Sequence, residues 1–129
     1  PSIGYRWMLR WLRLLPALGW AILLLFLGSR PDLPGPDLAI RLDKIAHFLA
    51  YGVLGGLAAW GCRGGGICGR RSILLVIPLL VGVADELNQS RVPGRSAELA
   101  DWLADCAGVL LAYMLVWLMF SNREEKGRA

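Results

Sequence analysis

The sequence predicts an all-α fold: a polytopic membrane protein built as a compact bundle of four transmembrane helices. Its 129 residues allow a single domain, which we take to cover residues 1–129. Hydrophobic residues make up 56% of the chain and the mean hydropathy is +0.50, which together exceed what a soluble domain of this size carries. The charged residues, 19% of the chain, gather between long apolar runs. This pattern is typical of a membrane protein.

The net charge of +4 has a simple explanation in such a protein. Lys and Arg accumulate in the cytoplasmic loops of membrane proteins. The sequence contains no basic stripe with interleaved aromatic residues, so we exclude nucleic acid as a partner.

Four apolar runs give the expected helices, at about residues 12–28, 44–61, 72–87 and 99–120. Their apolar parts are short beside the roughly 20 residues that cross a hydrocarbon core, and their polar ends restore the length. The first run follows three arginines as in a signal peptide, but no cleavage site follows Gly28, and we expect a retained helix. Prolines between residues 29 and 43 predict a loop, with Asp43 as the N-cap of the second helix.

Glycines in the second helix predict a close helix–helix contact. Gly52 and Gly56 form a G-x-x-x-G pair, and such small residues allow another helix to approach. The contact can lie inside one bundle or between two copies of the chain, so a homo-oligomer through Gly52 and Gly56 is possible.

The positions of Lys and Arg predict the orientation in the membrane. Nine of the 14 basic residues lie before the first helix, between the second and third helices, or after the fourth. Since the positively charged side normally stays inside, both termini should be cytoplasmic. The protein is then placed in the bacterial inner membrane, with the other two loops together on its outer face.

Two polar segments are expected to meet on that face. The first carries Lys44, His47 and Tyr51, whose spacing of three and four residues places them on one side of a helix. The second runs from residue 85 to residue 105. We predict a binding site formed by polar residues of both segments: Lys44, His47, Tyr51, Asp85, Glu86, Gln89, Arg91, Arg95, Ser96, Asp101 and Asp105.

The chemistry of these residues allows several roles. Asp101 and Asp105 are four residues apart and share a helix face, and two neighbouring carboxylates can divide acid and base roles. With His47 and Asp85, Asp101 is a candidate catalytic group. The arginines suit phosphate or carboxylate groups. Alternatively, the acids form ion pairs with Lys44, Arg91 or Arg95 that only hold the bundle together, or the arginines meet lipid phosphates non-specifically.

We expect neither a metal nor a cofactor. The ligand types for a metal are present in His47 and the nearby acids, but they lack any recognised spacing. Cys62 and Cys68 form a C-x5-C pair in the second loop, a weak metal or redox signal, and we expect reduced thiols there. No Gly-rich phosphate-binding motif and no Ser-His-Asp arrangement can be made from the sequence.

Residues 43–108 contain four short polar motifs: Lys44-x-x-His47-Phe48-x-x-Tyr51-x-x-Leu54-Gly55, Asp85-Glu86-x-x-Gln89, Arg91-x-Pro93-Gly94-Arg95-Ser96 and Asp101-x-x-x-Asp105-x-x-Gly108. Together, in this order, they resemble the motifs of VanZ-like membrane proteins. Asp105 differs from the family pattern, where Asn is usual, and Ser90 stands where an aromatic residue is common.

The resemblance implies a bacterial inner-membrane protein of about four helices, in a family whose namesake is linked to resistance to teicoplanin. The first functional hypothesis is a non-enzymatic envelope protein. Its outer site would bind a lipid head group, a lipid-linked cell-wall precursor or a glycopeptide-type antibiotic through Lys44, Arg91 and Arg95. The alternative is an enzyme that acts on a lipid phosphate or glycolipid linkage at the outer leaflet. Proton or ion movement through the intramembrane acids is a third possibility, less favoured because the charges crowd one side.

Overall fold

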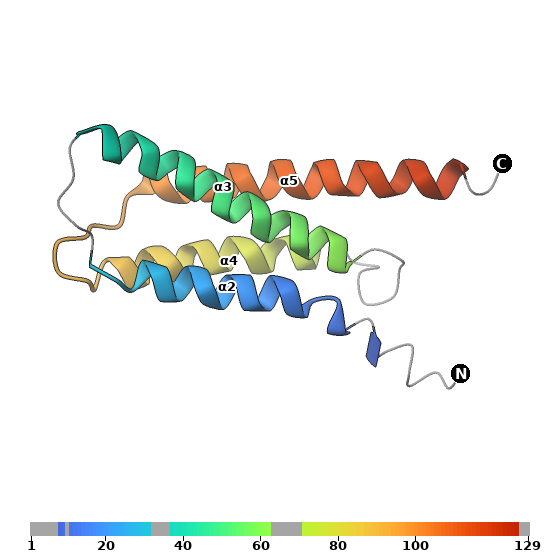
Figure 1. Ribbon diagram of the computed structural model, residues 1–129, viewed down its shortest axis with the longest axis horizontal. Coiled ribbons are helices and arrows are strands. Elements are labelled where there is room, and N and C mark those ends of the chain that lie inside the picture. Colours follow the sequence, from blue (N-terminus) through green and yellow to red (C-terminus); the bar gives the residue numbers. More distant parts are fainter. Residues whose placement is uncertain (1–7, 10, 32–36, 63–70, 127–129) are drawn as a thin grey trace.

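A computed structural model describes the chain except for residues 1–7, 10, 32–36, 63–70 and 127–129. The described part contains four long helices and no strand, which confirms the all-α prediction. With the labels of Figure 1, they are α2 (Leu15–Gly28), α3 (Asp37–Gly61), α4 (Arg71–Gln89) and α5 (Leu99–Lys126).

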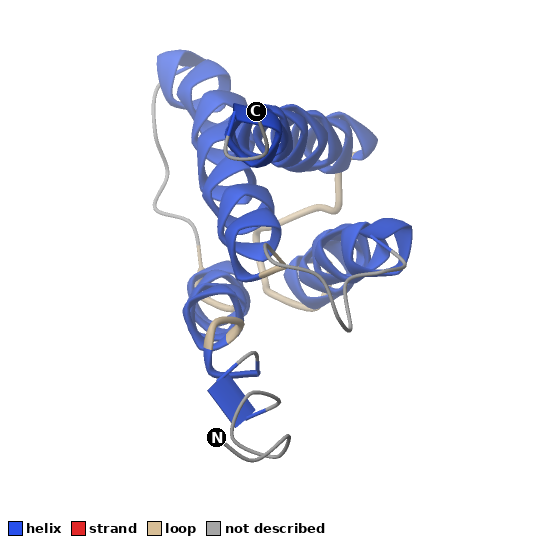
Figure 2. Cartoon of the chain, turned by 90° about the vertical axis from the view of Figure 1, so that its right-hand side faces the viewer, coloured by secondary structure: helices blue, strands red, loops and turns tan. Residues whose placement is uncertain are grey.

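Successive helices run in opposite directions. Figure 1 shows that α2 and α4 end where α3 and α5 begin, all at one end of the bundle. The end-on view in Figure 2 shows α3 packed against α5, with α2 and α4 lying below this pair. The most extensive helix–helix contact joins α3 to α5, although α4 separates them in the sequence. Both polar segments of the sequence therefore lie toward the same end of the molecule.

The second and fourth helices are longer than predicted. α3 begins at Asp37 and not near residue 44, so Asp43 lies inside the helix and is not its N-cap. α5 continues to Lys126, six residues beyond the predicted end. Hydropathy marks where the chain becomes polar, whereas a helix can continue through charged residues, and residues 37–43 and 121–126 contain neither Gly nor Pro. The other two helices, observed at Leu15–Gly28 and Arg71–Gln89, lie within three residues of the prediction.

Glycine allows α3 and α5 to approach closely. A Cβ on Gly108 would collide with the carbonyl oxygen of Phe48, and one on Gly55 would lie 2.5 Å from the carbonyl oxygen of Val109. Gly52 and Gly56 also face α5 of the same chain. The structure thus realises the first of the two predicted uses of the glycine pair, packing inside one bundle. Beside this contact Val109 is fully buried.

The outer surface of the bundle is apolar. Large hydrophobic side chains are exposed on all four helices, including Leu110, Leu111, Met114 and Leu115 on α5. Such surface is unusual in a soluble monomer and typical of a face that contacts lipid. By length and composition, one described helix segment, Leu99–Phe120 with a mean hydropathy of 2.0, can cross a membrane by itself. The apolar helix Leu15–Gly28 is shorter, so four membrane spans remain a prediction.

Candidate functional site

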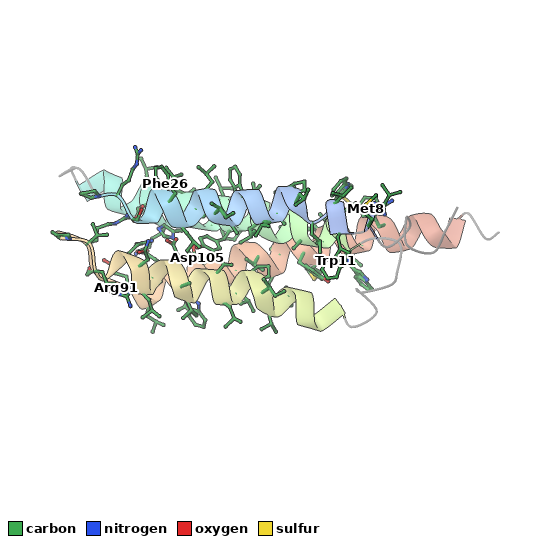
Figure 3. The ribbon with its side chains drawn as sticks, turned by 90° about the horizontal axis from the view of Figure 1, so that it is seen from below. Met8, Trp11, Phe26, Arg91 and Asp105 are labelled. Carbon is green, nitrogen blue, oxygen red and sulfur yellow. The ribbon has the colours of Figure 1, made fainter. Side chains whose placement is uncertain are left out.

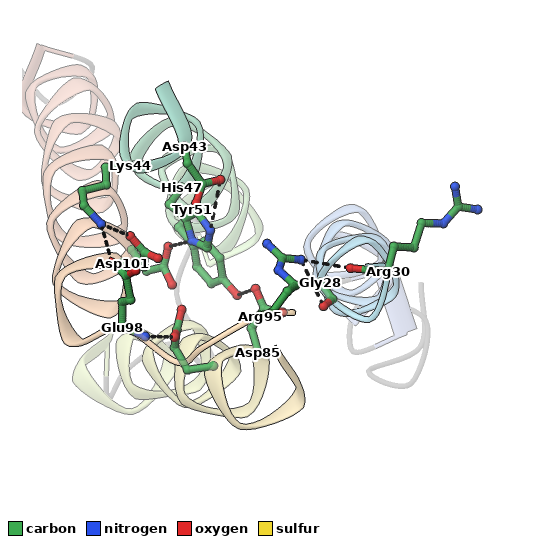
Figure 4. Close-up of polar contacts among 12 residues, drawn as sticks. Gly28, Arg30, Asp43, Lys44, His47, Tyr51, Asp85, Arg95, Glu98 and Asp101 are labelled. Carbon is green, nitrogen blue, oxygen red and sulfur yellow. Dashed lines mark hydrogen bonds and ion pairs between the residues drawn. The ribbon is translucent and has the colours of Figure 1, made fainter. Parts of the chain in front are cut away.

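Seven of the predicted site residues form a polar cluster between α3, α4 and α5. They are Lys44, His47, Tyr51, Asp85, Glu86, Asp101 and Asp105, and we call them the polar cluster. Figure 3 shows Asp105 among the helices, inward from the loop that carries Arg91. Hydrogen bonds from Lys44, His47 and Tyr51 to acids of the second polar segment confirm that the two segments meet (Figure 4).

Lys44 forms ion pairs with two acids near the start of α5. Its Nζ lies 2.6 Å from Asp101 Oδ1 and 2.9 Å from Glu98 Oε2. The Asp101 side chain is 8% exposed, whereas that of Glu98 is 48% exposed. The structural ion pair considered from the sequence is therefore present for Asp101, and the bond to Glu98 lies at the surface.

His47 occupies the middle of the cluster. Its Nδ1 is 2.9 Å from Asp105 Oδ1, and its Nε2 is 3.9 Å from Asp43 Oδ1. The imidazole also lies parallel to the ring of Tyr51, with centroids 6.4 Å apart. A carboxylate in this position fixes the orientation of the imidazole and stabilises its charged form.

Tyr51 connects α3 to α4. Its side chain is 1% exposed, and its hydroxyl donates a hydrogen bond of 2.9 Å to Asp85 Oδ2. The other oxygen of Asp85 packs against Gly28 of α2, where a Cβ would collide with it. Three helices thus enclose this carboxylate.

Several buried polar atoms lack a hydrogen-bond partner among the described residues. They are Oδ1 of Asp85, Oε1 of Glu86, Oδ2 of Asp105 and Nε1 of Trp102. The second oxygen of Glu86 accepts the backbone N–H of Glu98 at 3.0 Å, and the second oxygen of Asp105 contacts His47. Since an unmade buried hydrogen bond costs about 1–3 kcal/mol, each of these atoms would be stabilised by a partner.

The remaining predicted residues lie outside the cluster. Gln89 is buried one helical turn after Asp85. Arg95 donates from Nη1 to the carbonyl oxygens of Gly28 and Arg30, both at 3.3 Å. Arg91 and Ser96 are exposed on the loop. The expectation that Lys44, Arg91 and Arg95 together bind one anionic group stays a prediction, in a structure where Lys44 is paired with two acids and Arg91 is exposed.

A pocket of about 220 Å³ opens beside the cluster, between α2, α3 and α4. Its polar wall includes His47, Tyr51, Asp85, Gln89 and Arg95. Its apolar wall comes from Leu24 and Leu27 of α2 and from Ala46 and Ala50 of α3. The pocket therefore combines a charged wall with an apolar one, as a site for an amphiphilic molecule would.

Four contributors to this region were not among the predicted site residues. Two of them, Asp43 and Glu98, face the cluster from its rim. Trp20 donates from Nε1 to the carbonyl oxygen of Ala50 at 2.8 Å and ties α2 to α3. Gly28 closes the space around Asp85. The spacing Asp43-x-x-x-His47 could have identified the first, whereas the part played by α2 leaves no polar signal in its apolar sequence.

Two groups of residues could hold a metal ion by geometry. One is Asp43, His47 and Asp101, and the other is His47, Glu86 and Asp105. In each group one ligand atom per residue lies within 4.8 Å of the others.

Comparison with models of protein families identifies the family of this chain. The family model described as VanZ/LLP1 matches residues 6–120. The chain belongs to the VanZ/LLP1 family. No curated protein and no solved structure matches it. The family match confirms the resemblance found in the sequence motifs. Together with the apolar segment Leu99–Phe120 of α5, it indicates a membrane protein whose family is linked to teicoplanin resistance.

Proposed function

We propose that this VanZ/LLP1 protein binds the head group of an amphiphile at the outer face of the bacterial inner membrane. In this arrangement all four helices cross the bilayer and both termini are cytoplasmic. The excess of Lys and Arg outside the two loops next to the site supports the orientation. The antiparallel order of the helices, which brings those loops to one end of the bundle, agrees with it.

The observation that carries the proposal is the two-sided character of the pocket. Leu24 and Leu27 offer a surface to an acyl or polyprenyl chain, while Asp85, Gln89 and Arg95 offer partners to polar atoms. Arg95 suits a phosphate, and the carboxylate of Asp85 suits a hydroxyl or ammonium group. The proposed ligand is therefore a lipid or lipid-linked precursor that carries both an anionic group and hydrogen-bond donors.

The volume of the pocket narrows the choice of ligand. Pockets for drug-sized molecules enclose about 300–1,000 Å³, and this one encloses about 220 Å³. It accommodates a head group, whereas a glycopeptide antibiotic could insert only a part of itself. A lipid head group or the head of a cell-wall precursor is thus favoured over the antibiotic.

Native mass spectrometry tests this proposal. The protein is released from its membrane in mild detergent and its co-purifying lipids are identified. Gln89→Leu and Arg95→Lys, which alter the polar wall, should each reduce lipid occupancy at least several-fold. Arg30→Ala is the matched control, because the side chain of Arg30 points away from the pocket (Figure 4) and lies 4.8 Å from the ring of Phe26. Equal occupancy in all four proteins, or no lipid in any, refutes the proposal.

A second candidate function is hydrolysis or transfer at a lipid phosphate. It is favoured by the 2.9 Å contact between His47 and the buried Asp105, because His47 lines the pocket and a carboxylate-oriented imidazole can serve as a general base. The test is release of a soluble head group from labelled lipid in vesicles. Asp105→Asn should abolish most of this release while leaving lipid occupancy unchanged. Equal release by Asp105→Asn and wild-type protein excludes this function.

A further inference from the structure

We propose that His47, Glu86 and Asp105 bind one divalent transition-metal ion at the inner wall of the polar cluster. This inference goes beyond the proposed function, because it requires no lipid ligand. It revises the expectation from sequence that no metal is bound. That expectation depended on spacing along the chain, whereas the three residues come from three different helices.

The arrangement of the oxygen atoms supports a cation. Each of the two carboxylates has one oxygen held in place, Glu86 by the N–H of Glu98 and Asp105 by His47. The other oxygen of each is buried without a hydrogen-bond partner among the described residues. Asp105 is 1% exposed and Glu86 is 7% exposed, so water has little access to these atoms. A cation bound by both carboxylates could satisfy these oxygens, while the N–H of Glu98 would remain as the outer-shell contact that orients Glu86.

The distances fit a small ion after modest adjustment. One ligand atom from each of His47, Glu86 and Asp105 lies within 4.8 Å of the other two. Two ligands at about 2.1 Å from a tetrahedral zinc ion are about 3.4 Å apart. The three atoms therefore need to close by at most about 1.4 Å around an ion, which changes of side-chain torsion can supply.

The ligand set indicates the class of metal. One imidazole nitrogen with two carboxylate oxygens suits zinc, manganese or ferrous iron, whereas calcium prefers six to eight oxygens. The two negative charges of Glu86 and Asp105 balance a divalent ion, and the nearby Lys44 is engaged with Asp101 and Glu98. Three protein ligands also leave a coordination position open for water or a ligand group.

The other metal-capable group is less suitable. In it, Asp101 already bonds to Lys44 at 2.6 Å, and the side chain of Asp43 is 45% exposed. Neither acid has an oxygen among the buried atoms without a partner. The two groups share His47, so a single ion can use only one of them, and the contacts favour Glu86 and Asp105.

The experiment is a zinc titration of the full chain in detergent after treatment with a chelator. Isothermal calorimetry and elemental analysis should find one equivalent of zinc per chain. Glu86→Gln and Asp105→Asn should each weaken binding by 100-fold or more, while Asp101→Asn changes it by less than 5-fold. Glu86→Gln keeps an oxygen for the Glu98 N–H, and circular dichroism checks that each variant is folded.

Spectroscopy of the wild-type protein keeps the test independent of the variants. The X-ray absorption spectrum of bound zinc should contain one imidazole and otherwise oxygen ligands. Absence of stoichiometric zinc from folded wild-type protein, a spectrum without imidazole, or a loss of binding in Asp101→Asn but not in Glu86→Gln overturns the proposal. The titration contains no added lipid, so its failure is distinct from failure of the head-group proposal, which is measured by lipid occupancy.

Discussion

Removal of one hydroxyl, by the substitution Tyr51→Phe, should destabilise the bundle. The ring of Tyr51 and its parallel arrangement with His47 would remain, and only the hydrogen bond to Asp85 would be lost. Tyr51 is 1% exposed and Asp85 is 3% exposed, so the hydrogen bond is buried. The other oxygen of Asp85 already lacks a partner among the described residues. A hydrogen bond to a charged group contributes about 1.5–3 kcal/mol, and we expect a loss of about 2 kcal/mol.

The assay is equilibrium unfolding in mixed micelles, followed by circular dichroism. The variant Asp85→Leu removes the acceptor, and the double variant Tyr51→Phe/Asp85→Leu leaves an apolar pair of similar shape. Since the two residues are in contact, the double variant should be more stable than the sum of the single effects predicts, by about 1–3 kcal/mol. A change below about 0.5 kcal/mol for Tyr51→Phe, or additivity within that margin, would refute the reasoning.

Three further predictions use the same unfolding assay. Gly108→Ala should reduce the free energy of unfolding by about 1–3 kcal/mol, because its Cβ would collide with a carbonyl oxygen of α3. Gly19→Ala, with nothing within 4 Å of its Cβ, should be neutral or stabilising by about 0.4–1 kcal/mol. Equal effects of the two substitutions would contradict the close packing of α3 against α5. Asp101→Asn should destabilise more than Glu98→Gln, which should cost at most about 1 kcal/mol since Glu98 lies at the surface; the reverse order would contradict the burial of the Asp101 pair. Trp20→Phe should cost about 0.5–1.5 kcal/mol through the lost hydrogen bond from α2 to α3, and no measurable change would show that this bond contributes nothing.

The sequence was a good guide to the fold and to the residues that meet. Apolar runs separated by polar loops predicted four helices in the correct order. The helical spacing of Lys44, His47 and Tyr51 placed them on one face, and the structure has them facing the acids of α4 and α5. This part was predictable because helix periodicity and hydropathy act locally along the chain.

Three features could not be obtained in this way. The start of α3 was misplaced because the prolines before residue 37 predicted a loop as far as residue 43, although residues 37–43 are compatible with a helix. The separation of Arg91 from Arg95 depends on the path of the loop, in which Gly94 adopts a φ of 84°. The third is the pocket, whose wall includes Leu24 and Leu27, leucines indistinguishable in sequence from those that face lipid. All three depend on tertiary contacts.

The contact between α3 and α5 has a consequence for biosynthesis. Lys44 and His47 are made before their close partners Asp101 and Asp105, which belong to α5. In the four-span arrangement, α3 would enter the membrane with a charged group that costs about 2.5–3.5 kcal/mol when unpaired. Until residue 105 has been synthesised, the charged face of α3 must be in contact with water, lipid head groups or an insertion factor. The polar cluster therefore closes only after the start of α5 has been made, and a chain truncated after α4 would lack these acids altogether.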